Sequence, residues 1–157
     1  MTRNMEKDGG TGIGAAVINT KGKMERITID ALKRQARSMN VRVLDADIPG
    51  TTCGLYCDRL RTIWLADWLN DRQRLCTMQH ELIHARYRDL GCGSRYGARC
   101  ERRCRRETAL ALISPVDYGM AEEMWDGDAW HMAAELGVTM QVLADYRQIL
   151  AERVCIV

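Results

Sequence analysis

The sequence predicts an α+β fold in which a small sheet packs on a central helix and a helical part follows. Three observations lead to this prediction. Short apolar runs lie between residues 41 and 65, helical periodicity covers residues 70–87, and the periodicity stays helical beyond residue 100. A chain of 157 residues with 46% hydrophobic residues is long enough to bury a sizeable core as one globular unit.

The first elements are short and separated by turn residues. Residues 1–23 contain five glycines and little apolar periodicity, so we expect a flexible tail there. Apolar residues at helical spacing predict a helix over residues 27–39. An extended segment follows over residues 41–48 and stops at a Pro-Gly turn. Two more strands are expected over residues 54–57 and 62–65, which gives a small antiparallel or mixed sheet.

The next helix, over residues 70–87, contains the pattern H-E-x-x-H formed by His80, Glu81 and His84. On a helix the two histidines lie on one face and can both bind zinc, while Glu81 can accept a proton from a zinc-bound water. The competing interpretation is a buried helix whose histidines only pack. Because two of the three histidines of the chain fall in this pattern, we favour a zinc site and a hydrolase.

The strand immediately before this helix bears on substrate binding. If it lies beside the catalytic cleft with a free edge, that edge can pair with an extended substrate segment. Residues 64–69 are the candidate. The alternative is an interior strand without a free edge, and the sequence does not choose between the two.

A catalytic zinc ion normally takes three protein ligands, so a third ligand is expected downstream. Residues 100–114 have helical periodicity and end before Pro115. Glu101 and Glu107 lie on opposite shoulders of the apolar face of this helix, and periodicity does not decide which one turns inward. A surface ion pair with a neighbouring arginine is the common alternative for either carboxylate.

The C-terminal part is helical. We predict a short acidic helix over residues 116–124, then a helix-turn-helix outline from residue 128 to about residue 153. The second helix of that outline offers few basic side chains and includes an acidic one, so direct nucleic-acid binding is not expected and packing on the core is preferred. The expected organisation is therefore a tail over residues 1–23, a core over residues 24–115 and a helical extension over residues 116–157.

Charge and cysteine content exclude several classes of protein. The net charge of +2 predicts no nucleic-acid partner. Five arginines between residues 99 and 106 form either a solvated helix face or a partner-binding patch. Seven cysteines without a secretory segment or a membrane-spanning run favour a soluble, cytoplasmic protein, in which most cysteines are small core residues.

Over residues 42–115, and more loosely to the C-terminus, the sequence resembles the ImmA/IrrE family of bacterial and phage zinc metallopeptidases. The resemblance rests on the segment RQRLCTMQHELIHAR, on a second helix that opens with glutamate and ends at a proline, and on the LGVT stretch. It implies a zincin-like fold, Zn²⁺ as cofactor and hydrolysis of a protein substrate, a transcriptional repressor in a stress or mobile-element switch. The family's third ligand corresponds to Glu101. Glu107 occupies a position that is apolar in the family, and it stays an alternative.

Two other functions remain open. One is a regulator that binds DNA or protein on a metallopeptidase scaffold without turnover. The other is a structural zinc protein in which Cys100 or Cys104 fills the remaining coordination position, although such a site has no use for the base Glu81. The donor that stabilises the developing oxyanion stays unassigned among four side chains. These are Arg86, Tyr87, Tyr118 and His131.

Overall fold

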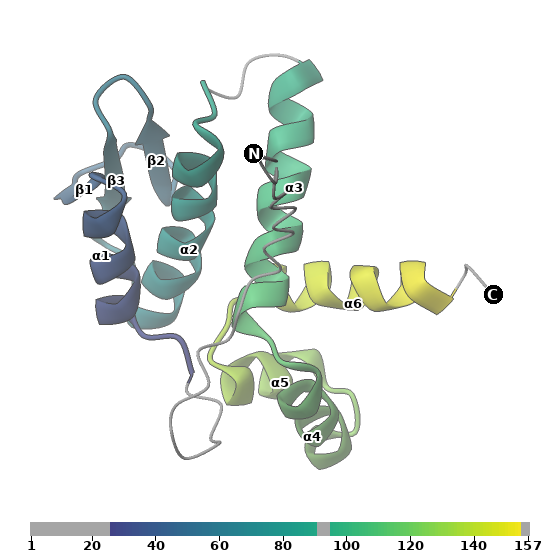
Figure 1. The fold of residues 1–157 in the computed structure, drawn as a ribbon. Coiled ribbons are helices and arrows are strands. Elements are labelled where there is room, and N and C mark those ends of the chain that lie inside the picture. The colour runs from purple at the N-terminus through teal and green to yellow at the C-terminus, as the bar shows by residue number, and fades with distance from the viewer. Residues whose placement is uncertain (1–25, 91–94, 155–157) are drawn as a thin grey trace, which may run out of the picture.

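The computed structural model describes residues 26–90 and 95–154, and the tail expected over residues 1–23 lies outside them. The described part is a small α+β fold with a three-stranded mixed sheet and six helices, as the sequence predicted. Figure 1 shows the sheet, α1 and α2 on one side of α3, with the last three helices gathered around its lower end. The elements, in order, are α1 (Ile29–Ser38), β1 (Arg42–Ala46), β2 (Gly54–Cys57), β3 (Thr62–Ala66), α2 (Asp71–Tyr87), α3 (Arg95–Leu112), α4 (Pro115–Trp125), α5 (Ala129–Leu136) and α6 (Met140–Val154).

The sheet has the order β1-β3-β2, with β1 parallel and β2 antiparallel to β3. The strand nearest α2 in sequence, β3, is therefore the central strand and has no free edge. This decides the open question about residues 64–69 in favour of an interior strand, and the strand itself ends at Ala66. The edge strands are β1 and β2, and the register of β2 with β3 pairs Gly54 with Leu65 and Tyr56 with Ile63.

One face of the sheet is covered by α2, and their contact forms the first of two apolar cores. Ile63 and Leu65 of β3 and Met78 and Leu82 of α2 are completely buried there. By about 25 cal/mol per Å², full burial of such side chains contributes roughly 1.5–3 kcal/mol each. The helix that carries the H-E-x-x-H pattern is thus held against the sheet along its length.

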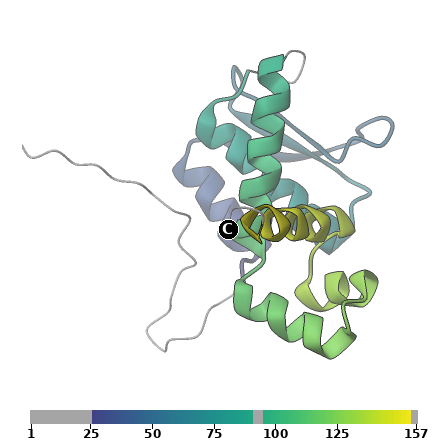
Figure 2. The ribbon, with the colours of Figure 1, turned by 90° about the vertical axis from the view of Figure 1, so that its right-hand side faces the viewer.

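The second core joins α3 to the C-terminal helices. Ala109 of α3 and Ile113, the residue just after α3, pack with Met132, Leu136 and Leu143 of α5 and α6. Figures 1 and 2 show α6 crossing the lower part of α3. Within the described residues, no helix has the length and apolar composition needed to cross a membrane.

The third helix begins earlier than the sequence suggested. It starts at Arg95 rather than Cys100, and its first turn contains the buried Gly97. The C-terminal helices follow the expected spacing, and Pro115 opens α4 behind the N-cap Ser114.

Candidate metal centre

The α2 helix has strong local start and stop signals, which hold its histidine-bearing face in place. The Asn70 side chain accepts a hydrogen bond from the Gln73 backbone, and the Gln73 side chain accepts one from the Asn70 backbone, which forms a capping box. The helix ends at Arg88 in the left-handed conformation. Between these ends, His80 and His84 lie one turn apart, with their Nε2 atoms separated by 3.1 Å.

The third group at this point is Glu101 of α3. Its Oε1 lies 3.0 Å from His80 Nε2 and its Oε2 lies 3.3 Å from His84 Nε2. One ligand atom from each of the three residues lies within 4.8 Å of the others, a grouping that can hold a metal ion. The two histidines also lower the pKa of the Glu101 carboxyl through hydrogen bonds, so it is ionised across the neutral range.

The other candidate, Glu107, faces a different part of the molecule. Its carboxylate accepts a hydrogen bond of 2.7 Å from the Tyr87 hydroxyl, and Arg86 lies 3.6 Å from it. The two glutamates are six positions apart along α3, which is not a whole number of helical turns. When Glu101 points at the histidines, Glu107 therefore points away from them. The structure thus brings Glu101 to the histidine pair and leaves Glu107 in a surface ion pair.

Asp89 was not identified from the sequence, yet it fixes the orientation of His84. Its Oδ2 lies 2.8 Å from His84 Nδ1, and its backbone N–H donates to the His84 carbonyl. A histidine bonded through Nδ1 presents Nε2 as its coordinating atom. The only sequence signal was an acidic residue just beyond the end of the histidine helix, which is too common to be specific.

A second group of potential ligands, His84, Asp89 and Cys104, lies behind the first and is fully buried. Arg103 fills the position that a second cation would need, because its Nη2 lies 2.6 Å from Asp89 Oδ2. The Cys104 sulfur lies 3.8 Å from the same oxygen. Cys104 therefore interacts with Asp89. This contact disfavours Cys104 as a ligand of the structural zinc site considered from the sequence.

Glu81 lies in the same helix turn but points toward β2. It is 8% exposed, and burial raises the pKa of its carboxyl, against the effect of the two histidines and of a hydrogen bond from the Tyr56 backbone. The strand β2 can approach α2 closely here because Gly54 has no side chain. A Cβ at that position would lie 2.6 Å from Thr77 Cγ2 and 3.2 Å from Glu81 Cγ.

These groups open onto a cleft of about 470 Å³. The cleft is lined by residues of β2 and α2, by α3 and by the start of α6, so the helical extension contributes one wall. Its lining includes Gly54, Thr77, His80, Glu81, Glu101, Arg105, Thr108, Gln141, Val142 and Asp145.

None of the four oxyanion donors considered from the sequence lines this cleft. Arg86 and Tyr87 line a separate cavity of about 570 Å³, and Tyr118 and His131 belong to the C-terminal helices. A basic side chain that does line it is Arg105, one helical turn beyond Glu101. The sequence showed Arg105 only as one of five clustered arginines.

A family model described as the IrrE N-terminal-like domain, Peptidase M78, matches residues 24–146. The chain belongs to this family. The match extends into α6 as far as Tyr146, so it includes the C-terminal wall of the cleft as well as the H-E-x-x-H helix. No curated protein and no solved structure matches the chain. Peptidase M78 membership and the cluster of donor groups together support a metallopeptidase-like domain.

Proposed function

We propose that this Peptidase M78 member is a zinc-dependent endopeptidase of zincin-like architecture that hydrolyses peptide bonds of a protein substrate. The observation that carries the proposal is the convergence of His80, His84 and Glu101 at one end of a cleft in which Glu81 also lies.

The three donors suit a zinc ion by chemistry and by arrangement. Two imidazoles and one carboxylate are a common ligand set of catalytic zinc, and they leave a coordination position for water. Asp89 presents His84 with Nε2 toward Glu101, and the side chain of Glu101 is 42% exposed, so the site is accessible from solvent. A bound zinc ion supplies a Lewis acid that polarises the scissile carbonyl and lowers the pKa of a coordinated water to about 7.

Glu81 is the general base in this proposal. It accepts the proton of the attacking water and then donates it to the leaving amine, so one carboxylate serves both proton transfers. Its buried position excludes bulk water, and the Tyr56 backbone N–H holds its carboxylate. The chain needs no nucleophilic side chain for this reaction.

The substrate has two points of attachment besides the metal. The edge strand β2 borders the cleft at Gly54 and has no partner strand on its outer side among the described residues, so an extended peptide can pair with it. On the opposite wall, Arg105 Nη1 forms no hydrogen bond within the described residues. We assign it the role of donating to a carbonyl oxygen of the bound peptide.

The helix-turn-helix outline gives no support to a DNA-binding function. Two of the side chains that a second helix would offer to DNA are engaged within the chain. Asp145 binds Arg105, and Arg147 donates to the Tyr118 hydroxyl and to the Gly127 carbonyl. We propose that a transcriptional repressor, in a stress or mobile-element switch, is the protein that is cut, as the family resemblance implies.

Zinc analysis of the purified wild type and of Glu81→Gln tests the enzyme proposal. We expect about one zinc per chain in both proteins, and cleavage of a repressor substrate by the wild type alone. Wild-type protein that binds no zinc, or cleavage that survives in Glu81→Gln, would refute it. Glu101→Ala should lose the metal, whereas Glu107→Ala should keep it.

A further inference from the structure

The outward face of α4 carries a row of large apolar side chains. The inner face of this helix carries Tyr118 and Ala121, which are buried against α5 and α6. On the opposite face, Val116, Met120 and Met124 are 65%, 60% and 60% exposed. Their spacing of four residues aligns them along about 12 Å of helix. Single exposed apolar residues are ordinary, but an aligned row marks a surface that binds something.

The row lies in the most acidic part of the chain. Residues 107–146 contain no lysine or arginine and eight acidic residues, although the whole chain has a net charge of +2. Within the described residues, five of these carboxylates form no ion pair. They all belong to α4, to α5 or to the turn between them: Asp117, Glu122, Glu123, Asp126 and Glu135.

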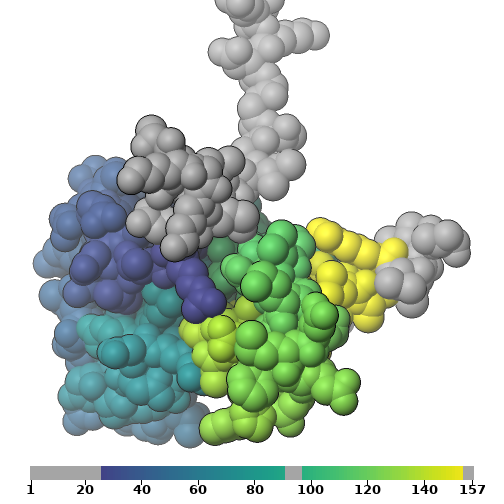
Figure 3. Space-filling view, turned by 90° about the horizontal axis from the view of Figure 1, so that it is seen from below, coloured from purple at the N-terminus to yellow at the C-terminus, as the bar shows by residue number. Residues whose placement is uncertain are grey.

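We propose that the outer face of α4 docks a basic amphipathic helix of a partner protein. The partner's apolar residues would cover Val116, Met120 and Met124, and its flanking lysines or arginines would neutralise the unpaired carboxylates. Methionine suits this role because its unbranched, polarisable side chain adapts to the shape of its partner. Figure 3 shows α4 at the surface, on the face seen from below.

Charge excludes two other classes of occupant, because nucleic acid and anionic lipid would both be repelled. A second copy of this chain is a poor fit for a related reason. Three of its clustered arginines, Arg103, Arg105 and Arg106, are already paired within their own chain. The face is also separate from the catalytic cleft, since none of its three apolar residues lines that cleft. The proposal therefore stands apart from the peptidase function.

A pair of synthetic peptides of about 18 residues tests the proposal on the full-length protein. One is an amphipathic helix of leucine and lysine, and its twin has glutamate in place of every lysine. Fluorescence anisotropy should show binding of the lysine peptide alone. The double variant Met120→Gln/Met124→Gln should weaken this binding at least about tenfold. The charge variant Asp117→Asn/Glu123→Gln should weaken it too and reduce its salt dependence.

The matched control is Leu60→Gln, because Leu60 is also exposed, at 47%, but lies beside the sheet. It should bind the peptide as the wild type does. Since the altered side chains are exposed or, at Asp117, partly exposed, circular dichroism should show unchanged folding for every variant. Equal binding by the double variant, or equal binding of the glutamate peptide, would overturn the proposal.

Two further measurements test whether a second copy of the chain, or its own residues 1–23, covers this face. Sedimentation velocity should show the same oligomeric state for the wild type and for Met120→Gln/Met124→Gln. A dimer that only the wild type forms would mean that a second copy covers the face, and would overturn the proposal. A chain that starts at Met24 should bind the lysine peptide no better than the full chain. Binding by the shortened chain alone would assign the face to residues 1–23 and would also overturn it.

Discussion

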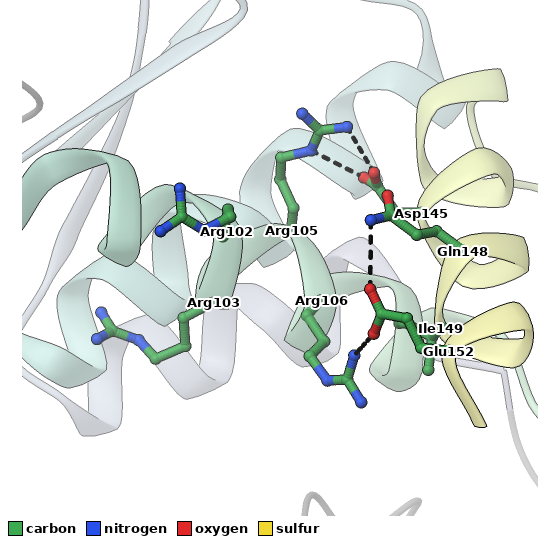
Figure 4. Close-up of a pocket in the computed structure, with 8 residues that line it drawn as sticks. All are labelled: Arg102, Arg103, Arg105, Arg106, Asp145, Gln148, Ile149 and Glu152. Atoms are coloured by element: carbon green, nitrogen blue, oxygen red, sulfur yellow. Dashed lines mark hydrogen bonds and ion pairs between the residues drawn. The ribbon is translucent and has the colours of Figure 1, made fainter. Parts of the chain in front are cut away.

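Asp145 of α6 holds the guanidinium of Arg105 through two hydrogen bonds, one of 3.1 Å from Nε to Oδ2 and one of 2.5 Å from Nη2 to Oδ1 (Figure 4). Asp145 is buried and also accepts a hydrogen bond from Gln141. A second ion pair between the same two helices, Arg106 with Glu152 at 2.8 Å, lies outside the cleft that His80, Glu81 and Glu101 line. The helical extension thus determines the position of a cationic group in the cleft.

Replacing Arg105 with alanine should lower kcat/KM for peptide cleavage by roughly 100-fold, the usual effect of losing one hydrogen-bond donor to the reacting carbonyl. The loss should fall mainly on kcat, because the contact strengthens as charge develops on the oxygen. Steady-state kinetics on the zinc-loaded protein measure this. Zinc content should not change.

The neighbouring pair provides the control for that experiment. Arg106→Ala removes an equivalent contact between α3 and α6 and should leave kcat/KM within about twofold, since surface ion pairs contribute only about 0–1 kcal/mol. Asp145→Asn should reduce kcat while Arg105 is still present. Equal losses in the Arg105 and Arg106 variants would mean that the helix contact matters and the guanidinium does not.

The contact between Asp89 and His84 should set the affinity of the metal site. Asp89→Asn should weaken zinc binding by about 10–100-fold, because the ring loses the carboxylate that orients Nε2. Competition with a chromogenic chelator measures the affinity. Asp128→Asn is the matched control, since Asp128 also lies 2.8 Å from a histidine Nδ1, that of His131 on α5. The same loss in both variants would contradict a specific role for Asp89.

Gly54 should be intolerant of even one added methyl group. Gly54→Ala places a Cβ 2.6 Å from Thr77 Cγ2, and the resulting overpacking should lower the free energy of unfolding by about 1–3 kcal/mol. Urea unfolding measures this. Thr77→Ser removes the clashing methyl group and should restore part of the loss. Gly119→Ala, on the exposed side of α4 with no atom within 4 Å, should instead stabilise the protein slightly. A neutral Gly54→Ala would contradict the close approach of β2 to α2.

The sequence predicted those features that depend on local spacing. His80 and His84 are four residues apart on a helix whose capping box is also local, so their shared face followed from periodicity. The choice between Glu101 and Glu107 depends instead on how α3 is rotated against α2, which is a tertiary relationship. Both flank the apolar face, and only the packing decides which one meets the histidines.

Dependence on tertiary packing also explains why the sequence did not predict the contact of Arg105 with Asp145 or the central place of β3. Asp145 and Arg105 are 40 positions apart, so nothing in either local sequence shows their contact. The central place of β3 follows from a parallel pairing with β1, for which the chain first forms β2 at the far edge and then turns back to place β3 between the two. Such pairings between distant segments leave no periodic signal in the sequence.

Asp58 should make the stability of the fold depend on pH in the acidic range. Hydrogen bonds from Arg88, and then from Tyr56, lower the pKa of this carboxyl from 3.8 to about 2. Since the folded state favours the ionised form, the contribution of Asp58 is fully present above about pH 4 and is lost as the pH falls toward 2. Urea unfolding at pH 6 and at pH 3 should show a smaller difference in Asp58→Asn than in the wild type. Asp47→Asn is the control, because exposed Asp47 forms no ion pair among the described residues, and its difference should equal that of the wild type. If Asp58→Asn kept the full wild-type difference, the network around Arg88 would not be a source of acid sensitivity.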